Sequence, residues 1–117
     1  MLDSLLNELI EISDFLKKSS GITAVEISQR MGELTVYSAK LPSIIADLEY
    51  VVAEAKNNSL EKHIGGNYSA QALKIKIEND CKNELKAQKF ADRLDSICGK
   101  NLDTLRSQLS YLKSLND

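Results

Sequence analysis

Apolar residues recur along this chain at intervals of three and four, the spacing that places side chains on one face of an α-helix. The first run lies within residues 2–19. Its apolar positions are Leu2, Leu5, Leu9, Ile12 and Leu16. Two lysines and Gly21 follow, which is typical of a helix end, because the helix dipole favours cations there and glycine readily closes the last turn. We therefore predict a first amphipathic helix over residues 2–19.

A longer stripe begins after Thr23, which stands three residues before Glu26 as in a capping box. From there one side of the helix follows a heptad repeat through Ile27, Met31, Leu34, Ser38, Leu41, Ile45, Leu48, Val52 and Ala55. Pro42 lies inside this stripe and removes one backbone hydrogen bond, which costs a helix interior about 3 kcal/mol. Because the stripe keeps its phase across Pro42, we predict one kinked helix over residues 24–56, with two helices joined by a loop as the alternative.

Residues 57–69 break the periodicity and gather Asn, Ser and a pair of Gly residues, so we predict that the chain reverses in this loop. Beyond it the apolar positions keep helical register across Gly99. A lone interior Gly costs a helix only about 1 kcal/mol, so one helix over residues 70–115 is favoured over a helix end at Gly99. Within it, residues 72–77 alternate apolar residues with lysines, which leaves an edge strand as the alternative there.

These elements predict a single all-α domain over residues 1–117, a long antiparallel helical hairpin with an additional N-terminal helix and coiled-coil-like packing. The composition agrees, since 43% of residues are hydrophobic, 27% are charged and aromatic residues are scarce. No apolar run reaches the roughly 20 residues that cross a bilayer, and acids stand at the N-terminus where an export signal needs bases. We therefore expect a cytoplasmic protein that does not associate with membranes.

The predicted helices differ in length. At about 1.5 Å per residue the third would span nearly 70 Å and the second roughly 50 Å. The third helix would therefore overhang its neighbours and leave four leucines without a partner in the chain, namely Leu102, Leu105, Leu109 and Leu112. Burying a leucine is worth about 1.5–3 kcal/mol, so we predict that these side chains form the interface of a homo-oligomer, most simply a twofold dimer, with another protein as the alternative partner.

The most basic segment carries a stripe of positive charge that could bind a nucleic-acid backbone. Its residues are Lys82, Lys86, Lys89 and Arg93, which recur at three and four. Acids intervene in the same segment, and aromatic residues that would stack on bases are few. Residues 1–55 carry nine acids and four bases, whereas residues 56–117 carry eight acids and eleven bases. A solvated face, or pairing with the acidic first half, is therefore favoured over nucleic-acid binding.

Candidate catalytic and metal-binding residues are few. His63 is the only histidine, and no Cys or carboxylate pair stands near it at metal-ligand spacing, so neither a metal nor a cofactor is predicted and a loop surface position is expected. Cys81 and Cys98, roughly 25 Å apart on one helix, are expected to be reduced structural thiols. Without an acid, a base and a nucleophile to combine, we predict a protein that is not an enzyme.

The closing segment LDTLRSQLSYLKS, after a helix such as ALKIKIENDCKNELKAQKFADRL, resembles the C-terminal half of small helical proteins of phages and prophages, often encoded beside recombination or replication genes. The likeness rests on leucine spacing with Arg106, Ser107, Ser110 and Lys113, and it covers only the C-terminal part of the chain. It implies a bacterial cytoplasm and an accessory role in phage DNA metabolism. The predicted function is a non-enzymatic helical interaction or oligomerisation module, with a nucleic-acid-binding accessory protein as the alternative.

Overall fold

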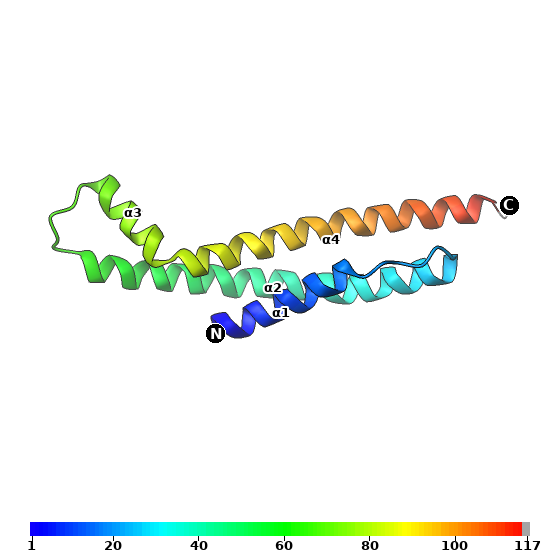
Figure 1. The fold of residues 1–117 in the computed structure, drawn as a ribbon, viewed down its shortest axis with the longest axis horizontal. Coiled ribbons are helices and arrows are strands. Elements are labelled where there is room, and N and C mark those ends of the chain that lie inside the picture. The colour runs from blue at the N-terminus through cyan, green and yellow to red at the C-terminus, as the bar shows by residue number, and fades with distance from the viewer. Residues whose placement is uncertain (116–117) are drawn as a thin grey trace.

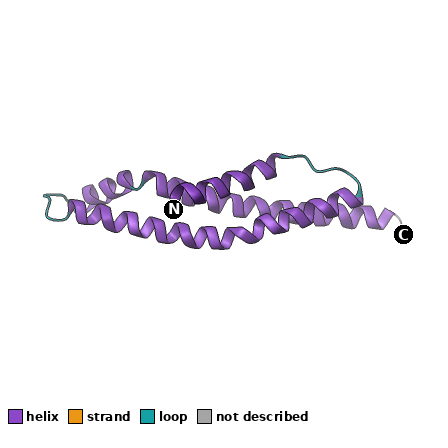
Figure 2. Ribbon diagram, turned by 90° about the horizontal axis from the view of Figure 1, so that it is seen from below, coloured by secondary structure: helices purple, strands orange, loops and turns teal. Residues whose placement is uncertain are grey.

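The computed structural model describes residues 1–115, which form four helices. These are α1 (Leu2–Lys17), α2 (Ala24–His63), α3 (Ala70–Asp80) and α4 (Lys82–Leu115). Helices α2 and α4 run antiparallel along a rod of 72 × 25 × 18 Å, and α1 lies against both of them (Figures 1 and 2). The chain is thus an all-α antiparallel hairpin with an additional N-terminal helix, which confirms the predicted fold class.

Helix α2 begins at the predicted capping box and runs farther than expected. Thr23 Oγ1 accepts a hydrogen bond from the Glu26 backbone N–H (3.2 Å) and donates one to Glu26 Oε1 (2.8 Å). The helix continues through Pro42 and ends at His63, so the loop occupies residues 64–69 and the predicted loop over 57–69 is wrong at its start. The weak helix formers at the start of the predicted loop remain helical because other parts of the fold contact them, as described below.

The segment after the loop forms two helices, so the single helix predicted over residues 70–115 is wrong. Helix α3 ends at Asp80, Cys81 forms a turn at φ −100° and ψ 18°, and α4 then leaves in another direction (Figure 1). Residues 72–77 lie inside α3, so the alternative strand does not form. The turn buries Cys81 and aims the end of α3 at the last turns of α2.

Helix α4 continues through Gly99, as predicted. Because the chain turns at Cys81, α4 has 34 residues and faces an α2 of 40 residues. At about 1.5 Å per residue these lengths are roughly 51 and 60 Å. The two helices therefore pack side by side over most of α4, and only the C-terminal end of α4 extends past the start of α2 (Figure 1).

The four C-terminal leucines pack on their own chain. Leu105 is buried, with 7% of its surface exposed, and Leu102, Leu109 and Leu112 are partly buried against the same core. The expectation that they lack an intrachain partner is therefore wrong. It followed from treating residues 70–115 as one rod, which made the third helix too long for its neighbour.

One core joins α1, α2 and α4. Helix α2 contributes residues seven apart in the heptad stripe, namely Ile27, Leu34, Leu41 and Leu48. Helix α1 contributes Leu5, Leu9, Ile12 and Phe15, and α4 contributes Ala87, Ala91, Leu94, Cys98 and Leu105. The apolar stripes read from the sequence are thus the surfaces that the helices bury against one another.

Arg30 of α2 fastens the C-terminal end of α1. Its guanidinium donates hydrogen bonds to the carbonyl oxygens of Phe15 (2.9 Å) and Lys18 (2.8 Å) and lies 3.9 Å from the centre of the Phe15 ring. Tyr37 stacks on the same ring at a centroid distance of 4.4 Å. Carbonyls at a helix end have no intrahelical partner, so Arg30 both satisfies them and fixes where the chain leaves α1 toward α2.

Candidate interaction surface at the end of the bundle

Four large apolar side chains are exposed at the end of the rod where α2 begins and α4 ends. Ile22 and Val25 lie at the start of α2, and Tyr111 and Leu115 lie in the last turns of α4. Their exposed fractions range from 63% to 86%. We call these four residues the end patch. Figure 1 shows that the start of α2 and the end of α4 both lie at the right-hand end of the molecule.

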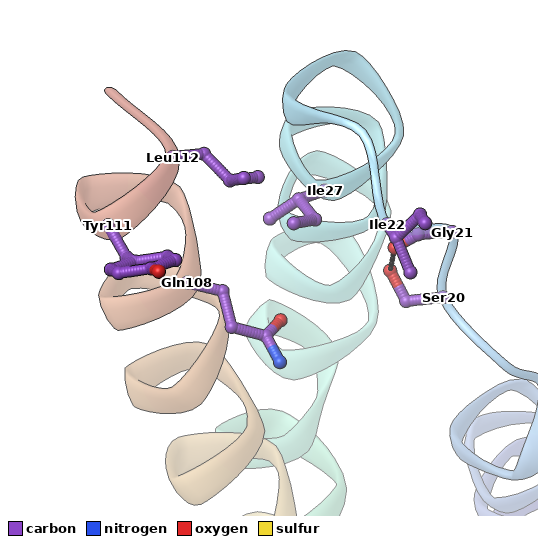
Figure 3. A pocket seen from close by; sticks show the side chains of 7 residues that line it. All are labelled: Ser20, Gly21, Ile22, Ile27, Gln108, Tyr111 and Leu112. Atoms are coloured by element: carbon purple, nitrogen blue, oxygen red, sulfur yellow. Dashed lines mark hydrogen bonds between the residues drawn. The ribbon is translucent and has the colours of Figure 1, made fainter. Parts of the chain in front are cut away.

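A pocket of about 280 Å³ opens between the two segments beside the end patch. Ile22 and Ile27 form its apolar wall on one side, and Tyr111 and Leu112 form the other. In Figure 3 the Leu112 side chain points across the pocket toward α2, where Ile27 lies. Both halves of the hairpin are therefore needed to build this surface.

Local structure at the start of α2 keeps one member of the end patch exposed. Ile22 and Ile27 occupy the positions of a hydrophobic staple, which normally pack on each other across a helix start. Ile22 nevertheless remains the most exposed of the four. Beside it, a Cβ on Gly21 would collide with the Glu26 side chain, so glycine allows the capping carboxylate to lie against the loop. The capping box thus holds the loop in a form that presents Ile22 to solvent.

The predicted interface residues lie next to the end patch without forming it. Leu112 lines the pocket, whereas Leu105 belongs to the core. Sequence reasoning missed Ile22 and Val25 because they stand outside every periodic stripe. The available signal was the placement of two apolar residues around the capping Thr23, where a solvated helix start usually carries polar side chains.

The predicted basic stripe is exposed along α4. Lys82, Lys86, Lys89 and Arg93 all lie on the surface. Within residues 1–115 none of them has a carboxylate oxygen within 4.0 Å. The ion pairs in this range are His63 with Asp80 and Arg106 with Asp103. The expected pairing with the acidic first half is therefore not made in this part of the chain, and the stripe faces water.

A polar cluster joins α2 to the end of α3, at the opposite end of the rod. Asp80 Oδ2 accepts a hydrogen bond from Ser59 Oγ at 2.8 Å and lies 2.8 Å from His63 Nε2. The Ser59 hydroxyl donates to the carboxylate and not to the imidazole, so this is not the hydrogen bonding of an activated serine nucleophile. His63 was expected on the surface of the loop, and that expectation is wrong, because it ends α2 with only 15% of its side chain exposed.

The cluster predicts how stability depends on pH. The hydrogen bonds from Ser59 and then His63 lower the pKa of the Asp80 carboxyl below its ordinary value near 3.8. Above the ordinary pKa of the unfolded chain, Asp80 is ionised in both states and its contacts contribute their full stabilisation. As the pH falls below that value, the unfolded chain binds a proton while the folded chain does not, and the stabilisation is lost as the pH approaches the lower pKa of the folded chain. Asp80→Asn should therefore destabilise the protein at pH 7 and much less near pH 3.

Urea unfolding of the wild type and Asp80→Asn at both pH values measures the difference. Asp95→Asn, an exposed carboxylate on α4, is the matched control and should show no such convergence. An Asp80→Asn effect of equal size at pH 3 and pH 7 would contradict the assignment of the low pKa to the Ser59 and His63 contacts.

Cysteine, metal and membrane features add no further site. Cys81 and Cys98 are free and buried, and burial raises the pKa of both thiols, which opposes the thiolate form that a nucleophile requires. Within residues 1–115 no three His, Cys, Asp or Glu side chains gather as a metal site would require. In the same range no helix has both the length and the apolar composition needed to cross a membrane.

No protein-family model matches this chain, and no curated protein or solved structure matches it. The fold and the end patch define its class directly: an elongated all-α bundle with an exposed apolar surface at one end.

Proposed function

We propose that this protein is a non-enzymatic helical module that forms a homodimer through its end patch. The observation that carries the proposal is the presence of four exposed large apolar side chains at one end of a folded rod, two of which, Ile22 and Tyr111, line one pocket. Scattered apolar residues on a surface are ordinary. A group of them beside a pocket, bordered by polar residues such as Ser20 and Gln108, is typical of a protein interaction surface.

The end patch suits a second copy of the chain because two different segments build it. In a twofold pair, Tyr111 and Leu115 of one copy would cover the start of α2 of the other, and the reverse contact would follow by symmetry. The exposed charges beside these segments are complementary, since Glu26 lies at the start of α2 and Lys113 near the end of α4. The same arrangement would bring each Lys113 toward the Glu26 of the other copy.

The test is the mass of the native protein as a function of concentration. Four side chains make a small interface, so we expect a dissociation constant on the order of 10–100 μM. Sedimentation equilibrium should show the 13.0 kDa chain shifting toward twice its mass over this range. Tyr111→Asp should weaken the dimer at least tenfold, because it places a charge in the centre of the apolar contact.

Tyr50→Asp is the matched control. Tyr50 is 62% exposed and Tyr111 is 64% exposed, but Tyr50 lies about 37 Å along α2 from the end patch. Its replacement should leave the dimer unchanged. A wild-type protein that stays at 13.0 kDa up to about 0.5 mM, or an equal effect of the two substitutions, would overturn the proposal.

A further inference from the structure

We propose that the outward ridge of α4 binds the phosphate backbone of double-stranded nucleic acid. The ridge consists of five exposed basic residues, Lys82, Lys86, Lys89, Arg93 and Lys100. Helical residues advance by about 100°, so Lys100 returns to the direction of Lys82 after five turns and all five fall within about 60° of the circumference. The predicted stripe of four thus extends by one member and forms a continuous line.

The ridge faces away from the rest of the bundle. The residues that α4 buries lie about 120–180° around the helix from Lys82; they are Ala87, Ala91, Leu94, Cys98 and Leu105. The start of α1 lies beside the ridge, since Lys86 lines a pocket with Leu2 and Asp3. All five ridge residues nevertheless remain exposed, so a long ligand can approach the basic line.

Positive and negative charge are separated on α4. Its acids lie about 60–160° from Lys82, all on the same side of the ridge; they are Glu84, Asp92, Asp95 and Asp103. Within residues 1–115 no carboxylate oxygen lies within 4.0 Å of a ridge nitrogen. The ridge therefore concentrates uncompensated positive charge on a chain whose formal net charge is −2, which is the arrangement that attracts a polyanion locally.

The length and chemistry of the ridge favour a duplex. From Lys82 to Lys100 it extends about 27 Å, which equals roughly eight base-pair steps of 3.4 Å. Proteins that bind single strands add exposed aromatic platforms for the bases. The aromatic residue between Lys82 and Lys100 is Phe90, which is partly buried against the core. A basic helix on an anionic membrane also needs an exposed apolar face, but between Lys82 and Lys100 the large apolar residue of α4 that is exposed is Ile97, at 36%.

Fluorescence anisotropy of the full chain with a labelled duplex of about 20 base pairs tests the proposal. We expect binding at low salt, with log K falling against log salt at a slope of about −4.5 for five phosphate contacts. The double substitution Lys86→Gln and Lys89→Gln should weaken binding at least tenfold and reduce the magnitude of the slope by about 2. The control, Lys40→Gln with Lys56→Gln, removes the same charge from exposed positions of α2 and should retain both values.

Three results would overturn the proposal. They are the absence of duplex binding at low salt, equal losses in the two double variants, and tighter binding to single strands or to vesicles containing phosphatidylserine than to the duplex. Tyr111→Asp changes the end patch and leaves all five ridge residues in place. The affinity of this variant for the duplex, per chain, therefore shows whether a loss of binding comes from the ridge or from the loss of the dimer.

Discussion

Replacing Leu105 with alanine is expected to lower the free energy of unfolding by about 2–4 kcal/mol. The side chain is 7% exposed and belongs to the core shared by α1, α2 and α4. Removing its methyl groups would leave a cavity between helices that can relax only partly. Urea unfolding followed by circular dichroism, at a concentration where the protein is monomeric, measures the loss.

The contrasting substitution is Tyr111→Ala. Because Tyr111 is largely exposed, the change should alter stability by no more than about 0.5 kcal/mol while weakening the dimer. Leu105→Ala should instead lower the stability of the monomer and leave the affinity of the dimer unchanged. If Leu105→Ala instead left the unfolding curve of the monomer unchanged and altered only its mass, Leu105 would belong to an interface after all.

Replacing Leu9 with aspartate is expected to detach α1 from the bundle. Leu9 is fully buried on the face that α1 presents to α2 and α4. The substitution removes apolar burial and places an ionised group in the core, at a cost of about 4 kcal/mol or more. Because α1 is a single short helix at one edge of the hairpin, we expect its amide protons to lose protection from exchange while those of α2 and α4 retain it.

Ile10→Asp supplies the control from the next position. Ile10 is 48% exposed, so the same charge on the same helix should leave α1 protected. Leu9→Ala introduces no charge and should lower the protection of α1 in the same direction by a smaller amount. Unchanged protection of α1 in Leu9→Asp, or equal losses in Leu9→Asp and Ile10→Asp, would contradict the role assigned to this face.

Local patterns predicted the features that depend on neighbouring residues. Spacing along one helix determines three such features, and the structure has each of them. They are the capping box at Thr23, the continuous helix through Pro42 and the continuous helix through Gly99. The end of α2 and the break at Cys81 depend instead on contacts between Asp80 and residues 17 and 21 positions earlier. Periodicity contains no information about such contacts.

The error at the break led to the wrong expectation that the four leucines lack a partner in their own chain. Once residues 70–115 were treated as one helix, their excess length required an overhang, and the four leucines were assigned to a partner. The basic stripe was placed correctly on the surface because it needed only the phase of α4. Lys100 was missed because six residues without a base separate it from Arg93, a gap that a search at spacings of three and four does not reach.

The attachment of α3 to the bundle determines which part of this protein can open. No side chain of α3 is fully buried, and its end is tied to α2 through the contacts of Asp80. Opening of residues 64–80 would therefore leave the core of α1, α2 and α4 in place. Exposed turns of this kind are where insertions are best tolerated, and an insertion here would lie at the opposite end of the rod from the end patch.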